Sequence, residues 1–130
     1  MKRFRVLTVL STLLAASVVA AVVLTSTASA HACGGKGEKL CPLQNWMEDN
    51  IQVPMEKKDF KKLEAAFAKL AKMAPDAKWN DGDKGWSKIA DAGAAAAKAS
   101  DFKAVRSTCK SCHKAWRKQY RKQHRQKPVK

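Results

Sequence analysis

Apolar residues recur three and four positions apart in four stretches of the chain, which is the spacing of one face of an α-helix. The predicted helices span residues 42–51, 55 or 59 to 74, 83–99 and 100–123. Pro54 should interrupt or kink the first stretch, and Pro75 should stop the second. No window alternates apolar and polar residues as a half-buried strand does. The pattern therefore predicts an all-α fold, and the short connections favour an antiparallel four-helix bundle.

The helix boundaries carry signals of their own. Asp81 or Asp83 should begin the third helix, and Ser100 should cap the fourth, with Asp101 in its first turn. The apolar face of the third helix consists of small residues, which allows tight helix packing or room for a flat ring. The fourth helix carries one apolar seam, made of Phe102, Val105, Cys109, Cys112, Trp116 and Tyr120. Beyond His124 the basic tail is expected to fray.

Residues 1–30 have the pattern of a secretory signal peptide. A head with three basic residues precedes an apolar run over residues 6–24, and Ala28-Ser29-Ala30 forms an exit of small residues. We expect cleavage after Ala30, which leaves residues 31–130 as a single domain exported to the periplasm. A single membrane-spanning anchor is the alternative, because the apolar run is long enough to be considered.

The four cysteines form two pairs of different character. Cys109-Lys110-Ser111-Cys112-His113 is a C-x-x-C-H run, the signature of covalent c-type haem attachment. Each thiol adds to one vinyl group of the haem, and the histidine supplies an axial nitrogen to the iron. Residues at i, i+3 and i+4 of a helix share one face, so one turn presents all three groups to one macrocycle. The expected cofactor is one covalent haem c, with His113 as an iron ligand.

Other chemistries of paired cysteines fit this motif less well. A zinc site needs two further ligands at close spacing, and His31 and His124 form no second half-site. A thioredoxin-like pair normally follows a strand and opens a helix, whereas this motif lies inside a helical stretch. A disulfide within the C-x-x-C pair is the remaining alternative. Cys33 and Cys41 frame a loop that contains glycines, and we predict a disulfide between them rather than free thiols.

The stretch around the motif resembles the class II c-type cytochromes, the family of cytochrome c′ and its low-spin relatives. In that family C-x-x-C-H lies in the last helix of a four-helix bundle and is followed by x-x-Tyr-Arg. Here Trp116 stands in place of the usual aromatic residue, and Arg117 follows it. The resemblance is strong over residues 100–121 and extends in pattern to the mature chain. It implies that the two cysteines form thioether bonds and that His113 is the fifth iron ligand.

The sixth coordination position separates two functions. A methionine sulfur makes the iron six-coordinate, low-spin and suited to electron transfer, whereas an apolar cover leaves a five-coordinate site that admits NO or CO. In the low-spin relatives the methionine comes from the first helix. This points to Met47 as the second iron ligand, with Met55 and Met73 as alternatives. Filling of the apolar core is the structural explanation for each of these side chains.

Further side chains are expected near the porphyrin. Trp116 would pack on its edge and Arg117 would pair with a propionate, and the alternatives are ordinary core packing and plain surface charge. Trp46 and Trp86 are candidates to line the pocket, with the same structural alternative.

Charge indicates the kind of partner. The chain has 26 Lys and Arg against 11 Asp and Glu, a net charge of +15. Removal of residues 1–30 takes away three basic and no acidic residues, which leaves +12 on 100 residues. Nucleic acid is the usual partner of so basic a chain, but an exported protein does not meet it. Acidic redox proteins or an anionic membrane surface are the partners we expect.

The sequence thus predicts an exported monohaem cytochrome, not an enzyme, that carries single electrons between periplasmic redox partners. A five-coordinate haemoprotein that binds NO or CO is the alternative. A haem-free thiol oxidoreductase that uses Cys109 and Cys112 is the third. The related cytochromes occur as monomers and dimers, so the resemblance also allows a homodimer.

Overall fold

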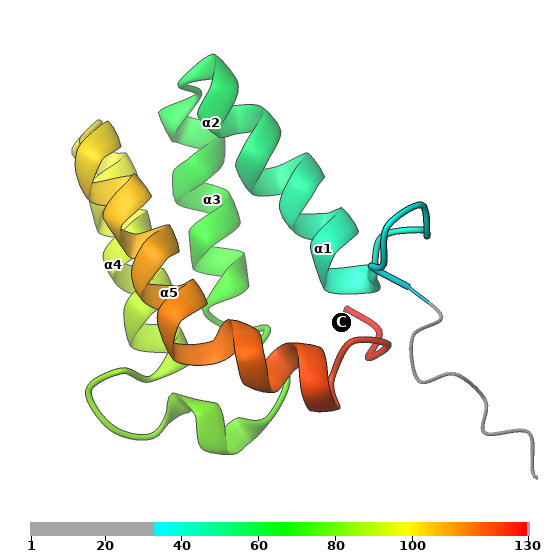
Figure 1. Cartoon of the computed structure of the whole chain (residues 1–130). Coiled ribbons are helices and arrows are strands. Elements are labelled where there is room, and N and C mark those ends of the chain that lie inside the picture. Colours follow the sequence, from blue (N-terminus) through cyan, green and yellow to red (C-terminus); the bar gives the residue numbers. More distant parts are fainter. Residues whose placement is uncertain (1–32, 130) are drawn as a thin grey trace, which may run out of the picture.

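The computed structural model describes residues 33–129, and the predicted signal peptide with its membrane-anchor alternative lies outside them. The described residues form helices and connections without a strand, as the all-α prediction requires. From α2 onward, consecutive helices run in opposite directions (Figure 1). The elements in chain order are α1 (Pro42–Met47), the π-helical turn η1 (Glu48–Gln52), α2 (Val53–Lys57), α3 (Phe60–Leu70), the 3-10 turn η2 (Ala77–Asn80), α4 (Trp86–Lys98) and α5 (Phe102–Gln123).

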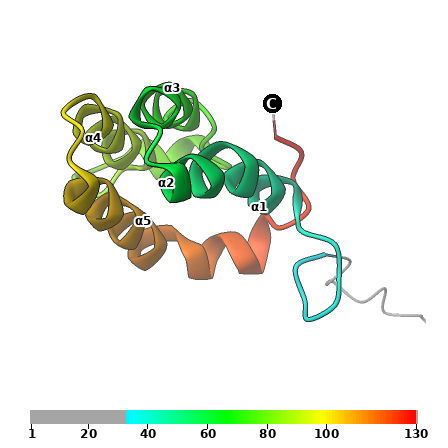
Figure 2. The same ribbon diagram turned by 90° about the horizontal axis from the view of Figure 1, so that it is seen from above.

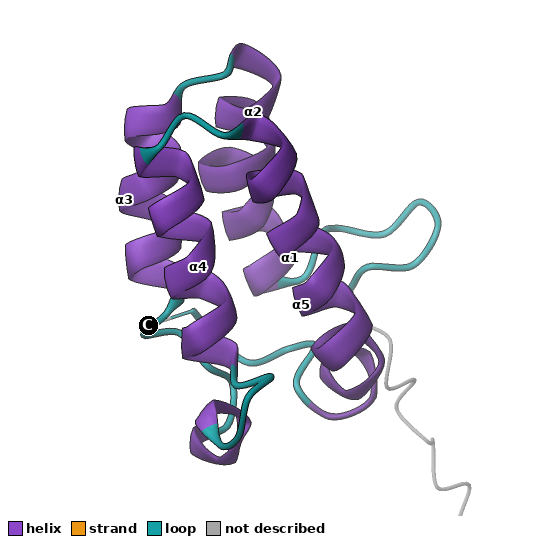
Figure 3. Cartoon of the chain, turned by 90° about the vertical axis from the view of Figure 1, so that its left-hand side faces the viewer, coloured by secondary structure: helices purple, strands orange, loops and turns teal. Residues whose placement is uncertain are grey.

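Helix α4 is the centre of the packing. It contacts α3 on one side and α5 on the other, and α2 packs against α3 (Figure 2). The side view in Figure 3 shows α3, α4 and α5 as neighbouring columns, with the η2 turn below them. At the α3–α4 contact, a Cβ atom added to Gly93 would lie 2.5 Å from Cδ1 of Phe67. The small face of α4 therefore serves tight helix packing, one of the two uses that the sequence allowed.

Of the two outcomes predicted at Pro54, an interruption or a kink, the structure excludes the interruption. The segment from α1 to α2 is continuous, and the N–H of Val53 donates to the Glu48 carbonyl five residues back. Proline has no N–H to donate, and its ring clashes with the carbonyl four residues before it. The wider π turn relieves this clash, so the helix passes Pro54 and ends before Lys58, which has a left-handed φ of 51°.

Both ends of the next helix follow from local hydrogen bonds. Of the two predicted starts, Asp59 is correct, because its side chain accepts from the N–H of Lys62 at 3.1 Å. The predicted end at Ala74 is wrong, since α3 stops at Leu70. The residue before a proline avoids the helical conformation, and the chain leaves the helix through short-range turns before Pro75.

The last two helices also begin at other residues than predicted. Neither Asp81 nor Asp83 caps α4. Instead, the N–H of Ser87 in the first turn donates to the side-chain oxygen of Asn80 at 3.1 Å. Ser100 is not the cap of α5, because it adopts a φ of 55° that ends α4. Asp101 is the cap, and its carboxylate accepts from the N–H of Ala104 at 2.9 Å. The predicted end of α5 at Gln123 is confirmed.

The basic tail folds back on the molecule instead of fraying. The Tyr120 hydroxyl donates to the carbonyl of the buried Arg125 at 3.1 Å, and the Arg125 guanidinium donates to the Gly34 carbonyl at 3.5 Å. Lys127 donates to the carbonyl of Pro75. These bonds tie the tail to the N-terminal loop and to the connection after α3, three segments that are far apart in the sequence.

Candidate functional site

The C-x-x-C-H motif lies in the middle of α5. Cys109 and Cys112 are free thiols on the apolar seam of that helix, and both are half-buried, while His113 is more exposed than either cysteine. The helical geometry places the three side chains on adjacent positions of one face. One turn of α5 therefore presents two sulfurs and an imidazole together, as the spacing predicted.

The apolar seam of α5 is buried near its two ends and partly exposed to solvent in its middle. Val105 and Tyr120 are buried, whereas the seam residues between them, Cys109, Cys112 and Trp116, are half-buried. No Cα atom of α1, η1 or α2 lies within 8 Å of a Cα atom of α5 among these described helices. The backbones of the first helical segment and of α5 therefore stand apart beside the motif.

The first helical segment runs antiparallel to α5. Lys58, just after α2, lies over the ring of Phe102 at the start of α5, with its Nζ 5.8 Å from the ring centroid. At the other end, Leu43 of α1 and Tyr120 of α5 line the same small cavity. Residues of α1 to α2 that lie between these two contacts therefore stand opposite the C-x-x-C-H motif.

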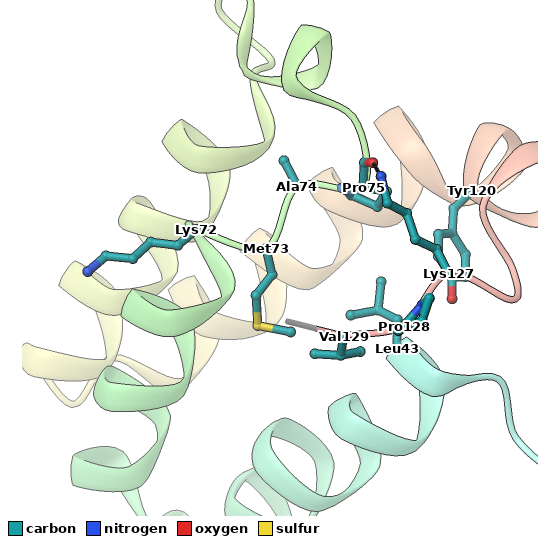
Figure 4. A pocket seen from close by; sticks show the side chains of 9 residues that line it. All are labelled: Leu43, Lys72, Met73, Ala74, Pro75, Tyr120, Lys127, Pro128 and Val129. Carbon is teal, nitrogen blue, oxygen red and sulfur yellow. Dashed lines mark hydrogen bonds between the residues drawn. The ribbon is translucent and has the colours of Figure 1, made fainter.

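The three candidate methionines occupy different places. The Met55 Sδ atom lies 3.9 Å from the Cys109 Sγ atom, which makes Met55 the methionine in contact with the motif. Met47 is half-buried against the core, about two turns earlier in the same segment. Met73 points toward Val129 in a cavity of about 150 Å³ that no residue of the motif lines (Figure 4).

Trp116 is held by a cluster of aromatic rings that the sequence did not predict. Its indole stacks on Trp79 with ring centroids 4.8 Å apart and an angle of 13° between the planes. Its Nε1–H donates to the Lys84 carbonyl at 3.1 Å. Trp79 also contacts the rings of Trp86 and His124, at centroid distances of 5.9 and 5.1 Å. One face of Trp116 is therefore already covered by protein.

The two other tryptophans expected to line the pocket, Trp86 and Trp46, lie in different parts of the fold. Trp86 is buried in the core and its Nε1–H donates to the Leu70 carbonyl at 2.7 Å, so it belongs to the packing of α3 on α4. Trp46 is half-buried on α1, with the ammonium of Lys69 5.9 Å from its ring centroid. Trp46 thus remains on the segment that faces the motif, and Trp86 does not line that side.

Arg117 lies one turn after His113 and is exposed. Partial burial lowers the pKa of His113, and the positive charge of Arg117 lowers it further. Both effects favour the neutral imidazole, which is the form that coordinates a metal. The pKa of His113 is lower in the folded protein than in the unfolded chain. Protonation of His113 therefore lowers the stability of the fold only when the pH falls below the pKa of the unfolded chain.

Burial opposes the ionisation of both thiols of the motif. Burial raises the pKa of Cys112 to about 11, with a further contribution from the neighbouring Cys109. Burial also raises the pKa of Cys109. Catalytic cysteines of thiol oxidoreductases have lowered pKa values, so the environment of this pair is opposite to what that chemistry needs.

We therefore expect slow alkylation of Cys112 in the haem-free protein. At pH 8 the folded Cys109→Ser variant should react with iodoacetamide about tenfold more slowly than the same chain unfolded in urea, since the smaller thiolate fraction outweighs its greater nucleophilicity. The rate should keep rising above pH 9, as measured by mass spectrometry over a pH series. A plateau below pH 9 would contradict the raised pKa.

The other pair of cysteines forms the predicted disulfide. Cys33 and Cys41 are bonded, and both are buried at the start of α1. The buried guanidinium of Arg125 contacts the same loop through Gly34. The disulfide therefore anchors the beginning of the fold, away from the C-x-x-C-H motif.

Positive charge covers the helix that carries the motif. Eight basic residues along it are exposed: Lys103, Arg106, Lys110, Lys114, Arg117, Lys118, Arg121 and Lys122. The two ion pairs of the described residues are Lys62–Asp59, at 3.4 Å, and Lys88–Asp83, at 3.8 Å. The cations of α5 are therefore not neutralised by carboxylates within the described part of the chain.

Comparison of the chain with models of protein families, with curated proteins and with solved structures found no match. Within residues 33–129, no group of three or more His, Cys, Asp and Glu side chains is arranged to hold a metal ion. No helix among those residues has the length and apolar character needed to cross a membrane.

Proposed function

We propose that this protein is an exported monohaem c-type cytochrome that carries single electrons between periplasmic redox partners. The observation that carries this proposal is the pair of free, half-buried thiols one turn apart on α5, with His113 directly after them. This is the arrangement of side chains that covalent haem attachment needs. The same proposal includes the fold: we infer an antiparallel four-helix bundle of the class II cytochrome type that holds a covalent haem.

The residues around the motif fit a flat apolar cofactor. The middle of the α5 seam is half-exposed, and the helix opposite it offers Trp46, Met47 and Met55, which are half-buried as well. In the proposal Cys109 and Cys112 hold the haem c through thioether bonds, and Met47 and His113 are the iron ligands. The haem supplies one-electron redox chemistry when bound, and the chain supplies ligands, burial and surface charge.

Met47, not Met55, is our proposed sixth ligand. A thioether bond would join Cys109 to the edge of the macrocycle, so a side chain in contact with Cys109 would line the pocket wall and would not supply the second iron ligand. Met55 has this contact, at 3.9 Å, and Met47 does not. We assign Met55 to the pocket wall beside Cys109, Trp116 to the edge of the porphyrin and Arg117 to a propionate.

Spectroscopy of the purified holoprotein tests this function. The wild type should be low-spin, with a sulfur-to-iron charge-transfer band that disappears in Met47→Ala and survives in the matched variant Met55→Leu. Loss of the band in Met55→Leu, with Met47→Ala unchanged, would transfer the ligand role to Met55. A high-spin wild type that binds CO readily would instead support the five-coordinate alternative and refute electron transfer through Met47.

The surface charge predicts how the protein meets its partner. With an acidic redox protein, the second-order rate of electron transfer should fall at least about tenfold between low and high salt, because screening removes the attraction of α5. Stopped-flow kinetics measures this rate. Lys110→Glu combined with Lys114→Glu should flatten the salt dependence, whereas Lys36→Glu with Lys39→Glu, the same change in charge on the N-terminal loop, should not.

Anionic vesicles distinguish the second kind of partner. If the membrane surface is the target, the wild type should bind phosphatidylglycerol vesicles at low salt. The variant with Lys110→Glu and Lys114→Glu should bind these vesicles more weakly. Binding to the acidic protein without binding to vesicles assigns the charge to protein docking.

A further inference from the structure

Pro54 and the π turn before it lie directly between the two methionines that face the motif. The N–H of Val53 donates to the carbonyl of Glu48 in this turn, and the side-chain amide of Asn50 donates to the Trp46 carbonyl at 2.9 Å. Pro54 itself is buried. A π turn of this kind inside a helix changes which side chains share a face.

The change can be stated as an angle. An α-helix turns about 100° per residue, so in a regular helix Met55 would stand about 80° around the axis from Met47. The π turn takes up one extra residue, and the seven remaining steps leave the two side chains about 20° apart. Met55 is therefore on the Met47 face because of the turn, and there its sulfur reaches Cys109.

We propose that Pro54 is a positioning residue for the haem pocket. By imposing the π turn it brings the Met55 sulfur onto the face that carries Met47, so that one helix supplies both the iron ligand and the wall beside Cys109. This inference rests on the proposed function for its haem-dependent part. The alignment of the two methionines is a property of the polypeptide and can be tested without haem.

The test uses one substitution and one compensating deletion. In Pro54→Ala the restored N–H can bond to the Asn50 carbonyl, and the segment should relax to a regular α-helix that turns Met55 away. Deletion of the exposed Asp49 in the Pro54→Ala background removes the extra residue. It should return Met55 to the Met47 face within a regular helix. Gln52→Ala, an exposed change inside the turn, is the matched control.

In haem-free protein, nuclear Overhauser contacts report the alignment directly. The contact between the Met55 methyl group and the Cys109 side chain should be present in the wild type and in Gln52→Ala. It should be lost in Pro54→Ala and recovered when Asp49 is also deleted. Alanine is a better helix former than proline, so loss of fold is not expected, and circular dichroism checks this. A contact that persists in Pro54→Ala overturns the proposal.

In holoprotein, the charge-transfer band and the reduction potential report the pocket. Pro54→Ala should keep its covalent haem, measured as pyridine haemochrome, while its band weakens and its potential falls as the wall beside Cys109 opens to water. The compensated variant should recover both. An unchanged band and potential overturn the haem-dependent part. Absence of covalent haem in the wild type refutes the proposed function instead, and leaves the contact measurement to decide the role of Pro54.

Discussion

The variant Cys109→Ala with Cys112→Ala, expressed beside a working cytochrome c maturation system, should be a colourless protein with the mass of the bare polypeptide. The wild type should be coloured, heavier by one haem, and keep that haem through extraction with acidified acetone. The reason is that only the thioether bonds from these two sulfurs make haem attachment irreversible. Mass spectrometry of the intact protein and the pyridine haemochrome spectrum measure the difference.

The chain provides its own control for this experiment. Cys33 and Cys41 are also a pair of cysteines, but they form a disulfide at the start of α1. Replacing both of them by alanine should leave one haem bound, although it should lower stability. His113→Ala tests a separate point, since the thioethers remain available while the axial nitrogen is lost. A wild type that is colourless and has the bare mass would refute the cytochrome proposal as a whole.

Trp79→Ala should be the most destabilising single substitution outside the motif. Trp79 is 2% exposed and contacts Trp86, Trp116 and His124, so its removal leaves a large cavity between α4, α5 and the η2 turn. Truncation of a buried tryptophan costs about 3–5 kcal/mol. Unfolding by guanidinium chloride, followed by circular dichroism, gives this difference in the free energy of unfolding.

Trp79→Phe separates ring packing from the polar atom of the indole. The Nε1–H of Trp79 is buried without a hydrogen-bond partner in the described structure. An unpaired buried donor costs about 1–3 kcal/mol, so its loss should offset much of the smaller ring area of phenylalanine. We expect Trp79→Phe to lose far less stability than Trp79→Ala. Equal losses would mean that the indole N–H has a partner in solution.

Trp79 also connects stability to the candidate site. It stacks on Trp116, which is three residues after His113 on the same helix. The stack fixes the orientation of the Trp116 ring, which in our proposal packs on the porphyrin edge. Trp79→Ala should therefore loosen the surroundings of the motif as well as the core, which the haem spectrum of that variant would register.

The raised thiol pKa values weigh against the haem-free alternative. A dithiol oxidoreductase attacks through a thiolate, and burial opposes that charge at both cysteines of the motif. In a cytochrome the same burial is useful, because the sulfurs end as neutral thioethers in an apolar pocket. The electrostatic surroundings thus favour the proposal on grounds that are independent of the motif itself.

Periodicity determined the helices but not all of their ends. The 3.6-residue pattern of α3, α4 and α5 is strong because each buries one stripe, and these helices exist where it places them. The missed boundaries depend on single hydrogen bonds. The Asn80 side chain accepts from the N–H of Ser87 in the first turn of α4, and Asp101 caps α5 in place of Ser100, choices that neighbouring polar residues offer almost equally in the sequence.

The sequence alone determined the C-x-x-C-H motif, the disulfide between Cys33 and Cys41 and the all-helical class, because each depends on local spacing or on residue type. The tertiary structure decided between alternatives that the local sequence could not distinguish. It carried the helix through Pro54 by a π turn over Glu48–Gln52, joined the tail to the N-terminal loop through Arg125, and put Met55 rather than Met47 against Cys109. These outcomes depend on contacts between segments more than 50 residues apart, or on a helix kept intact by its packing. The residues of a short stretch of chain do not determine the energies of these contacts.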